Sequence, residues 1–215
     1  MTEQELQTEY AFRYQNFLMP LAERLALHLQ DNLQGVSRID RVAARAKTPG
    51  SFFAKAAKTC AEGRPKYLHP FEQIQDLIGA RVIVFYSHDV QTVAETIERY
   101  YRHIERRDLI PESEAEFGYF GKHFILSMPE DIIDDGDNLE KIPNFFELQI
   151  KTLFQHAWSE ANHDLAYKPD EPLTPLQKRQ IAFTAAQAWG ADQIFAELHS
   201  ELNGPASNQN IDGTP

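Results

Sequence analysis

Residues 145–168 read FFELQIKTLFQHAWSEANHDLAYK, and this stretch decides the fold class. Its first eight residues alternate with period two, which predicts a β-strand with one apolar face. The opposite face presents a carboxylate, an amide and an amine, from Glu147, Gln149 and Lys151. The residues that follow take a helical period, and we expect this helix to end before Pro169. The stretch is therefore a strand that leads directly into a helix.

The polar face of this strand has two interpretations. The alternation alone favours the solvated outer face of an edge strand. The other interpretation is a site for a metal and a polar substrate, since a strand holds side chains more firmly than a loop does. Resemblance favours the site: the segments ELQIKT (147–152), QHAWSE (155–160) and HDLAYK (163–168) resemble the C-terminal signature of the RelA/SpoT synthetase domain, the pyrophosphokinase module that makes (p)ppGpp.

The composition indicates a globular protein. The 215 residues suit one domain with helical additions, and 42% hydrophobic residues can build a sizeable core. No apolar run approaches the length of a membrane span, and the N-terminus lacks the pattern of a signal peptide, so we expect a cytoplasmic protein without a membrane partner. The single Cys60 can form no internal disulfide, and we expect it to contribute only to packing.

The charge of the chain is unevenly distributed. The net charge is −11, which disfavours nonspecific attraction to nucleic acid or to an anionic membrane. Residues 38–66, however, hold eight Lys or Arg against two acids, a local charge of +6. A cationic segment on an acidic protein indicates a compact polyanionic ligand such as a nucleoside triphosphate.

Part of this cationic segment resembles the ATP-binding signature of the same family. Alternation over residues 41–47 predicts a strand with a basic face, and Ser51 could cap a helix that runs to about Glu62. The resemblance implies that ATP is bound by Arg45, Lys47, Ser51 and Lys55. Guanidinium and ammonium groups suit this role because both form charge-assisted hydrogen bonds to phosphate. Without the resemblance, a plain basic strand edge would fit these residues equally well.

Residues 76–82 read DLIGARV and lead into an apolar strand of the buried kind. An acid before a glycine is often only a turn or capping residue. The order of residues here is similar to a second motif of the family. The resemblance implies that Asp76 holds Mg²⁺ and that Arg81 faces the phosphates of ATP.

Residues 118–123, GYFGKH, resemble the family motif Gly-Tyr-x-Ser-x-His, whose tyrosine stacks on the guanine of the acceptor nucleotide. Two departures stand out. Gly121 replaces the serine, and acids replace the basic residues that usually lie just upstream, at Glu112, Glu114 and Glu116. The resemblance implies that the acceptor is held by Tyr119, Lys122, His123, Gln149 and His156.

Two further patterns suggest metal ligands only superficially. The acidic segment 131–137 lacks the glycine position and the closing glutamate of an EF-hand loop, so we expect a solvated loop. On the helix after the Glu147 strand, His156, Glu160 and His163 share one side. This spacing could be mistaken for a zinc site, but the resemblance implies a structural and acceptor-side role.

The predicted fold class is α+β, with a mixed sheet of about five strands flanked by helices. Resemblance to the family implies a nucleotidyltransferase-like core. We expect an N-terminal helical segment (1–35) interrupted at Pro20, a synthetase core (36–168), a C-terminal helix (169–202) and a disordered tail (203–215). The strands are predicted near residues 41–47, 80–86, 104–109, 119–127 and 144–151.

The resemblance implies a GTP pyrophosphokinase that transfers the β,γ-pyrophosphate of ATP to the 3′-hydroxyl of GDP or GTP. Asp76 and Glu147 would bind Mg²⁺, and Glu147 would also serve as the base for the attacking hydroxyl. One alternative is a toxic small synthetase that modifies the tRNA 3′ end or makes an adenosine alarmone. Another is a catalytically inactive nucleotide-binding module. A homo-oligomer and an antitoxin partner are both left open.

Overall fold

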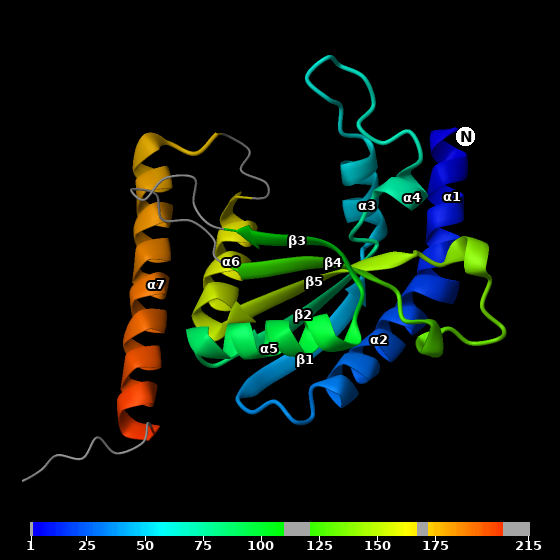
Figure 1. Cartoon of the computed structure of the whole chain (residues 1–215). Coiled ribbons are helices and arrows are strands. Elements are labelled where there is room, and N and C mark those ends of the chain that lie inside the picture. The colour runs from blue at the N-terminus through cyan, green and yellow to red at the C-terminus, as the bar shows by residue number, and fades with distance from the viewer. Residues whose placement is uncertain (1, 110–120, 167–171, 204–215) are drawn as a thin grey trace, which may run out of the picture.

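The computed structural model describes residues 2–109, 121–166 and 172–203, and it contains a five-stranded sheet with helices on both sides (Figure 1). The parallel pair in the sheet is β2 with β5, and the other neighbouring strands are antiparallel. This confirms the predicted α+β class with a mixed sheet. In sheet order the strands are β1 (Ile39–Ala46), β2 (Ile78–Val84), β5 (Phe145–Thr152), β4 (Gly121–Ser127) and β3 (His103–Leu109).

Seven α-helices lie in the described part of the chain. None of those described is long and apolar enough to span a membrane. Short 3₁₀ turns lie at Glu130–Ile132 and Leu139–Lys141. The α-helices are α1 (Glu3–Arg13), α2 (Met19–Asn32), α3 (Pro49–Ala56), α4 (Pro70–Gln73), α5 (Ser87–Tyr100), α6 (Leu153–Ala166) and α7 (Pro175–Asn203).

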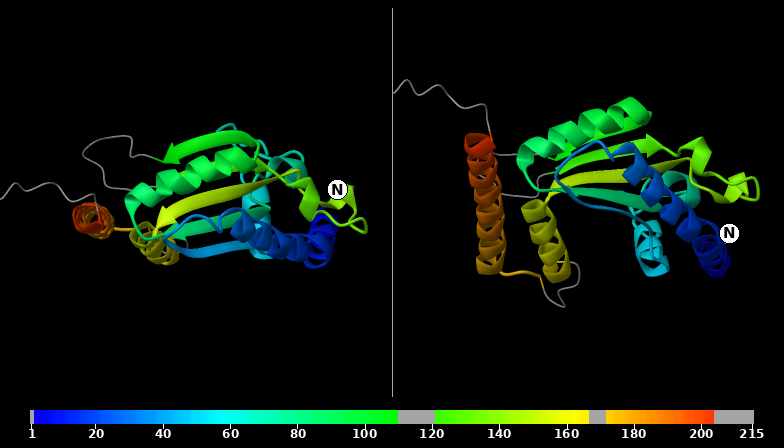
Figure 2. Two further views of the ribbon diagram at one scale, coloured as in Figure 1. Left: turned by 60° about the horizontal axis from the view of Figure 1, so that its bottom comes forward. Right: turned by 90° about the horizontal axis from the view of Figure 1, so that it is seen from below.

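The two faces of the sheet differ in what covers them. Apolar side chains on one face, such as Val82, Leu148 and Phe124, form the core with α2 and α5. Figure 2 shows α5 on this side of the sheet and α3 and α6 on the other side. The predicted alternation of β5 is confirmed, because Phe146, Leu148 and Ile150 are fully buried. The apolar face supplies the stability of the core, and the polar face is available for a site.

The N-terminal helix was expected to be interrupted at Pro20, but its irregular turn lies just before this residue. Residues Tyr14–Leu18 form a π-helical turn, and Pro20 then lies in the first turn of α2, where its missing N–H is tolerated. The ring of Tyr10 stacks on that of Phe52, with centroids 3.7 Å apart, and its hydroxyl donates to the Lys47 carbonyl oxygen at 2.6 Å. The α1 helix therefore supports the backbone at Lys47.

The predicted start and end of the third helix were wrong. Thr48, and not Ser51, caps α3: its hydroxyl accepts from the Ser51 N–H, and Pro49 is the first helical residue. The helix ends at Ala56 and not near Glu62. The chain then turns back on itself, with a β-bridge between Thr59 and Pro65.

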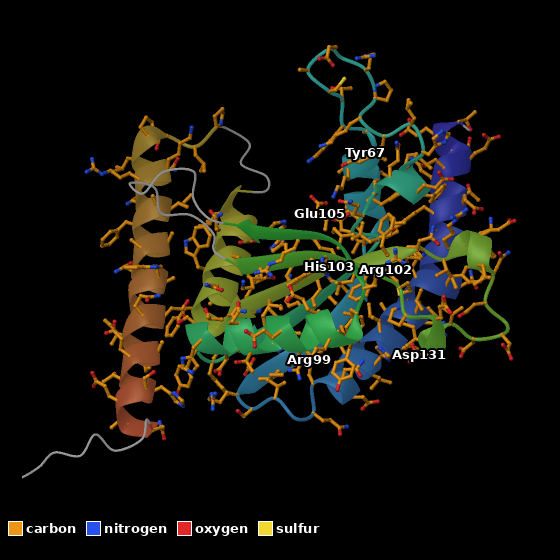
Figure 3. The ribbon with its side chains drawn as sticks, in the orientation of Figure 1. Tyr67, Arg99, Arg102, His103, Glu105 and Asp131 are labelled. Carbon is orange, nitrogen blue, oxygen red and sulfur yellow. The ribbon has the colours of Figure 1, made fainter. Side chains whose placement is uncertain are left out.

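The acidic segment 131–137 is largely exposed, as the prediction of a solvated loop requires, and it also contacts α2. Arg24 donates to the Ile132 carbonyl at 2.7 Å and pairs with Asp134 at 2.8 Å and with Asp137. His28 lies 3.4 Å from Asp131, which Figure 3 shows beside α2. Arg24 therefore neutralises part of the negative charge of this segment.

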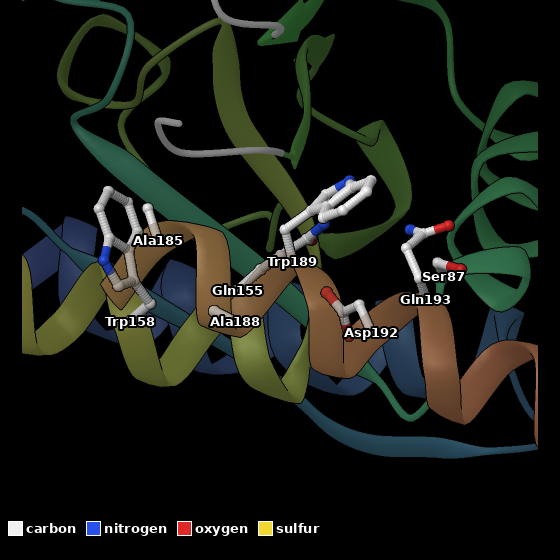
Figure 4. A pocket seen from close by; sticks show the side chains of 8 residues that line it. All are labelled: Ser87, Gln155, Trp158, Ala185, Ala188, Trp189, Asp192 and Gln193. Carbon is white, nitrogen blue, oxygen red and sulfur yellow. The ribbon is translucent and has the colours of Figure 1, made fainter. Parts of the chain in front are cut away.

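The last helix, α7, carries a buried carboxylate. Asp192 is 3% exposed and accepts a hydrogen bond from the Thr152 hydroxyl at 2.7 Å, at the junction of β5 and α6. Its second oxygen, Oδ1, is buried without a hydrogen-bond partner among the described residues. Burial raises the pKa of Asp192 to about 6, although the Thr152 hydrogen bond opposes this. Figure 4 shows Asp192 lining a small pocket with Gln155, Trp158 and Trp189.

This buried carboxylate predicts a dependence of stability on pH. The pKa of Asp192 is raised in the folded protein above its unfolded value, so the protonated carboxyl stabilises the fold at low pH. This stabilisation, about 2–3 kcal/mol, is lost as the pH rises through about 6. Asp192→Asn cannot ionise, so we expect its stability relative to the wild type to increase between about pH 4 and pH 6 and to stay constant at higher pH. Thermal melting across this range measures the effect. Asp164→Asn, at an exposed position, is the control, and an equal pH dependence in all three proteins would contradict the prediction.

Candidate active site

The polar face of the sheet is built from rows of residues that face one another across the strands. In one row Arg45 of β1 lies beside Gly79 of β2, which lies beside Glu147 of β5. The row continues through Ile125 to Glu105 on the edge strand β3 (Figure 3). Gly79 has no side chain, and an added Cβ would meet nothing within 4 Å. The row therefore contains a gap between a guanidinium and a carboxylate.

The next row holds the remaining polar groups of the sheet centre. Arg81 of β2 pairs with Gln149 of β5, which pairs with His123 of β4. Because directly paired residues point to the same side of a sheet, these side chains lie on the face of Glu147. The two rows therefore bring polar residues from β1, β2, β4 and β5, which are far apart in the chain, onto one face of the sheet.

Asp76 joins two lysines at one end of this face. Its carboxylate accepts from Lys47 Nζ at 2.7 Å, and Lys55 Nζ of α3 lies 3.0 Å from the other oxygen, Oδ1. Lys47 follows β1, where its N–H donates to the Leu77 carbonyl at 2.9 Å. Burial acts to raise the pKa of Asp76, but Lys47 and Lys55 outweigh it and hold the pKa below its ordinary value. Asp76 is therefore a carboxylate at neutral pH.

Glu147 pairs with His123 across β5 and β4. The Glu147 Oε1 atom lies 3.1 Å from His123 Nδ1. Burial acts to raise the pKa of Glu147, and the negative charge of Asp76 adds to this, but the contact with His123 outweighs both and leaves the pKa lowered. The effect of Asp76 on Glu147 shows that the two carboxylates share one electrostatic environment.

A third group of polar contacts connects the sheet to α6. Arg81 Nη1 donates to Glu160 Oε1 at 2.9 Å and lies 3.5 Å from His156 Nδ1. Lys151, which is 4% exposed, donates to the Ser159 hydroxyl at 3.2 Å. Burial and the charge of Arg81 lower the pKa of Lys151 to about 8.

These residues can be tested against the predicted Mg²⁺ ion. Asp76 Oδ1 is buried in the site, and Lys55 Nζ lies 3.0 Å from it. An oxygen of this kind, close to a second carboxylate, fits a hard cation that prefers oxygen ligands. Asp76 and Glu147 therefore fit the ion. The zinc interpretation finds no support, since the described part of the chain holds no cluster of three metal-ligating His, Cys, Asp or Glu side chains.

The structure brings most of the predicted site residues together on the polar face. Arg45 lies there on β1, and Ser51 lies in the first turn of α3, where its hydroxyl accepts from that of Thr48. Lys122 does not join them. It pairs with Ile150, so it lies on the apolar face of the sheet, opposite to His123. Tyr119 and the acids at 112, 114 and 116 fall outside the described residues.

The cationic segment 38–66 does not act as one patch. Lys47 and Lys55 enter the site, but Arg38 binds buried Asp89 of α5 through two nitrogens, with the closest contact at 2.7 Å.

Two polar residues on the site face, Lys151 and Glu160, have contacts that sequence reasoning missed. The alternation of β5 places Lys151 correctly, but its burial by α6 leaves no local signal in the sequence.

Comparison with known proteins agrees with this geometry. Residues 44–172 match the model described as the region found in RelA / SpoT proteins. The GTP pyrophosphokinase YjbM of Bacillus subtilis is 24% identical over 202 residues, which cover 88% of this chain and 90% of that protein. The structure of the small alarmone synthetase 1 from Bacillus subtilis bound to its product pppGpp is similar with a TM-score of 0.69 at 25% identity. That match covers 88% of this chain and 98% of the other.

A GTP pyrophosphokinase family protein from Streptococcus pneumoniae has the same fold, with a TM-score of 0.71 at 24% identity over 94% of this chain and 96% of the other. The family match covers more than half of the chain and includes β2, β4 and β5, the strands that carry Arg81, His123 and Glu147. The chain therefore belongs to the RelA/SpoT family.

Proposed function

We propose that this chain is a small alarmone synthetase that transfers the β,γ-pyrophosphate of ATP to the 3′-hydroxyl of GDP or GTP. The similarity to a GTP pyrophosphokinase and to a synthetase bound to pppGpp supports this activity. The single observation that carries it is the meeting of two carboxylates with four cations on one face of the sheet. The carboxylates are Asp76 and Glu147, and the cations are Arg45, Lys47, Lys55 and Arg81.

The donor half of the site would lie over β1, β2 and α3. Lys47 and Lys55 come from two elements and converge on Asp76, so their positions are defined before a ligand arrives. Arg45 borders the gap at Gly79, which offers room for a base or a phosphate chain. Cations held in place in this way neutralise the charge of a triphosphate without reorganising during the reaction.

The chemistry requires a positioned nucleophile more than covalent help from the protein. Glu147 is ionised at neutral pH, and a carboxylate within hydrogen-bond reach can accept the proton of the attacking hydroxyl. His123 holds one oxygen of Glu147 and thereby orients it. Mg²⁺, held by Asp76 and Glu147, would neutralise charge on the phosphates of ATP.

The acceptor half would lie over β4 and β5. Gln149 and His123 are paired across the strands on the same face as Glu147, so an acceptor held by them would lie beside the base. The role of Tyr119 in acceptor binding stays a prediction, whereas Lys122 lies on the opposite face of the sheet and takes no part in this half of the site. The conclusion that GDP or GTP is the acceptor rests on the similarity to the named relatives.

The first test concerns the base. Glu147→Gln keeps the size of the side chain but removes its charge and its ability to accept a proton, so turnover should fall at least about a hundredfold. The melting temperature should stay close to that of the wild type. Turnover is measured as the formation of labelled product from γ-labelled ATP and GDP. Glu140→Gln, on an exposed turn, is the control, and near-normal turnover in the Glu147 variant would exclude the base role.

The second test concerns the gap above β2. Gly79→Val places a side chain between Arg45 and Glu147, and because its Cβ would meet nothing within 4 Å, the fold should tolerate it. If the donor nucleotide occupies this space, the affinity for a non-hydrolysable ATP analogue should fall at least about tenfold. Calorimetric titration measures the affinity, and Gly136→Val in an open loop is the matched control. An unchanged affinity would place the donor elsewhere.

The third test identifies the acceptor. The wild-type protein is incubated with γ-labelled ATP and, separately, with GDP, GTP, AMP or deacylated tRNA. We expect labelled product with GDP or GTP and none with tRNA, because the acidic chain does not attract a long polyanion without a dedicated surface. Labelling of tRNA, with no product from GDP or GTP, would overturn the proposed acceptor and leave the donor half intact.

A further inference from the structure

The guanidinium of Arg81 is held by two residues of α6 and not by its own strand. Glu160 Oε1 accepts from Arg81 Nη1 at 2.9 Å, and His156 Nδ1 lies 3.5 Å from the same nitrogen. The Arg81 side chain is 22% exposed, so it is enclosed by its surroundings but still reaches solvent. Glu160 and His156 lie one helical turn apart and approach the guanidinium from one side.

A second tie fixes the position of α6 relative to the sheet. Lys151 donates to the Ser159 hydroxyl at 3.2 Å, and this hydroxyl donates to the His156 carbonyl at 3.0 Å. At the start of α6, the Thr152 hydroxyl accepts from the Gln155 N–H and the Gln155 side chain accepts from the Thr152 N–H, which forms a capping box. The turn that carries His156 and Glu160 is therefore anchored at its beginning and at its middle.

The protonation states suit this arrangement. Burial lowers the pKa of the His156 ring, and the positive charges of Arg81, Lys151 and Arg41 add to this effect against the opposing charge of Glu160. The ring is therefore neutral at neutral pH and can accept from Arg81. Burial acts to raise the pKa of Glu160, but the charge and hydrogen bond of Arg81, together with the charge of Lys151, leave it lowered, so Glu160 is ionised.

Both contacts use the same nitrogen of Arg81. A guanidinium has five N–H donors arranged as a planar fork, and one edge of the fork can be held while the other binds a ligand. Among the residues that the structure describes, Glu160 and His156 contact Arg81 through Nη1, which leaves Nε and Nη2 facing the ligand site. A long side chain fixed in this way loses less conformational freedom when it binds a phosphate.

We propose that Glu160 and His156 are positioning residues, which hold Arg81 in the orientation that binds the phosphates of the donor nucleotide. This inference rests on the proposed function, in which Arg81 contacts ATP. It gives His156 a role in the donor half of the site, in contrast to the acceptor role that the family resemblance implied. The competing possibility is that Glu160 occupies Arg81 and hinders ATP, which predicts the opposite change in affinity.

The test compares a truncation with a conservative replacement. Glu160→Ala removes the acceptor for Nη1 and should weaken binding of a non-hydrolysable ATP analogue about tenfold. Glu160→Gln keeps an oxygen that can accept from Nη1 and should restore most of the affinity. The matched control is Glu98→Ala, which breaks an ion pair with Arg106 of similar length, 2.8 Å, elsewhere on the protein. Calorimetric titration measures the affinities, and thermal melting confirms that each variant is folded.

A double-mutant cycle separates positioning from a general effect on structure. If Glu160 acts through Arg81, then Arg81→Ala combined with Glu160→Ala should bind no more weakly than Arg81→Ala alone. Additive losses, an unchanged affinity in Glu160→Ala, or tighter binding in that variant would each overturn the inference. No effect of Arg81→Ala would also overturn it. Failure of the wild-type protein to bind the ATP analogue would instead refute the proposed function.

Discussion

The site depends on the parallel pairing of β2 with β5, which inserts the last strand of the chain between β2 and β4. This pairing places Glu147 beside Gly79 and Gln149 beside Arg81, across more than sixty residues of sequence. Side chains in a strand alternate with period two, so a slip of one residue would move Glu147 into the apolar core and bring Leu148 to the site. The burial of Phe146, Leu148 and Ile150 under α5 therefore also fixes the direction of the polar groups.

The second constraint is the concentration of positive charge on the polar face. Arg45, Lys47, Lys55 and Arg81 lie close together, and like charges this close repel one another unless anions separate them. Asp76 separates the two lysines, and Glu160 neutralises Arg81. These ion pairs have two consequences: they reduce repulsion among the cations, and they hold the cations where a triphosphate would meet them. The acidic balance of the whole chain does not oppose this, since some of its acids are bound elsewhere, as Asp134 and Asp137 are by Arg24.

Elements outside the sheet also position the site. α1 supports Lys47 through the hydroxyl of Tyr10, and α3 carries Lys55 to the same carboxylate. α6 holds Arg81, and α7 reaches the start of α6 through the buried pair of Asp192 and Thr152. The helices that the sequence shows as amphipathic packing elements therefore reach the polar face by single, specific polar contacts. Changes at these contacts can alter the site without touching a ligand.

Local patterns in the sequence determined the elements and the faces of the strands. The period of residues 145–168 predicted β5 and α6, and the spacing of Asp76, Gly79 and Arg81 placed an acid before a buried strand with a cation on it. Only the tertiary structure decided which side chains meet. The tertiary structure pairs His123 with Glu147 and buries Lys151 under α6. It also places Lys122 on the opposite face of the sheet and lets Arg81 form an ion pair with Glu160. Period and propensity act over a few neighbouring residues, whereas strand order, register and helix docking depend on burial across the whole chain.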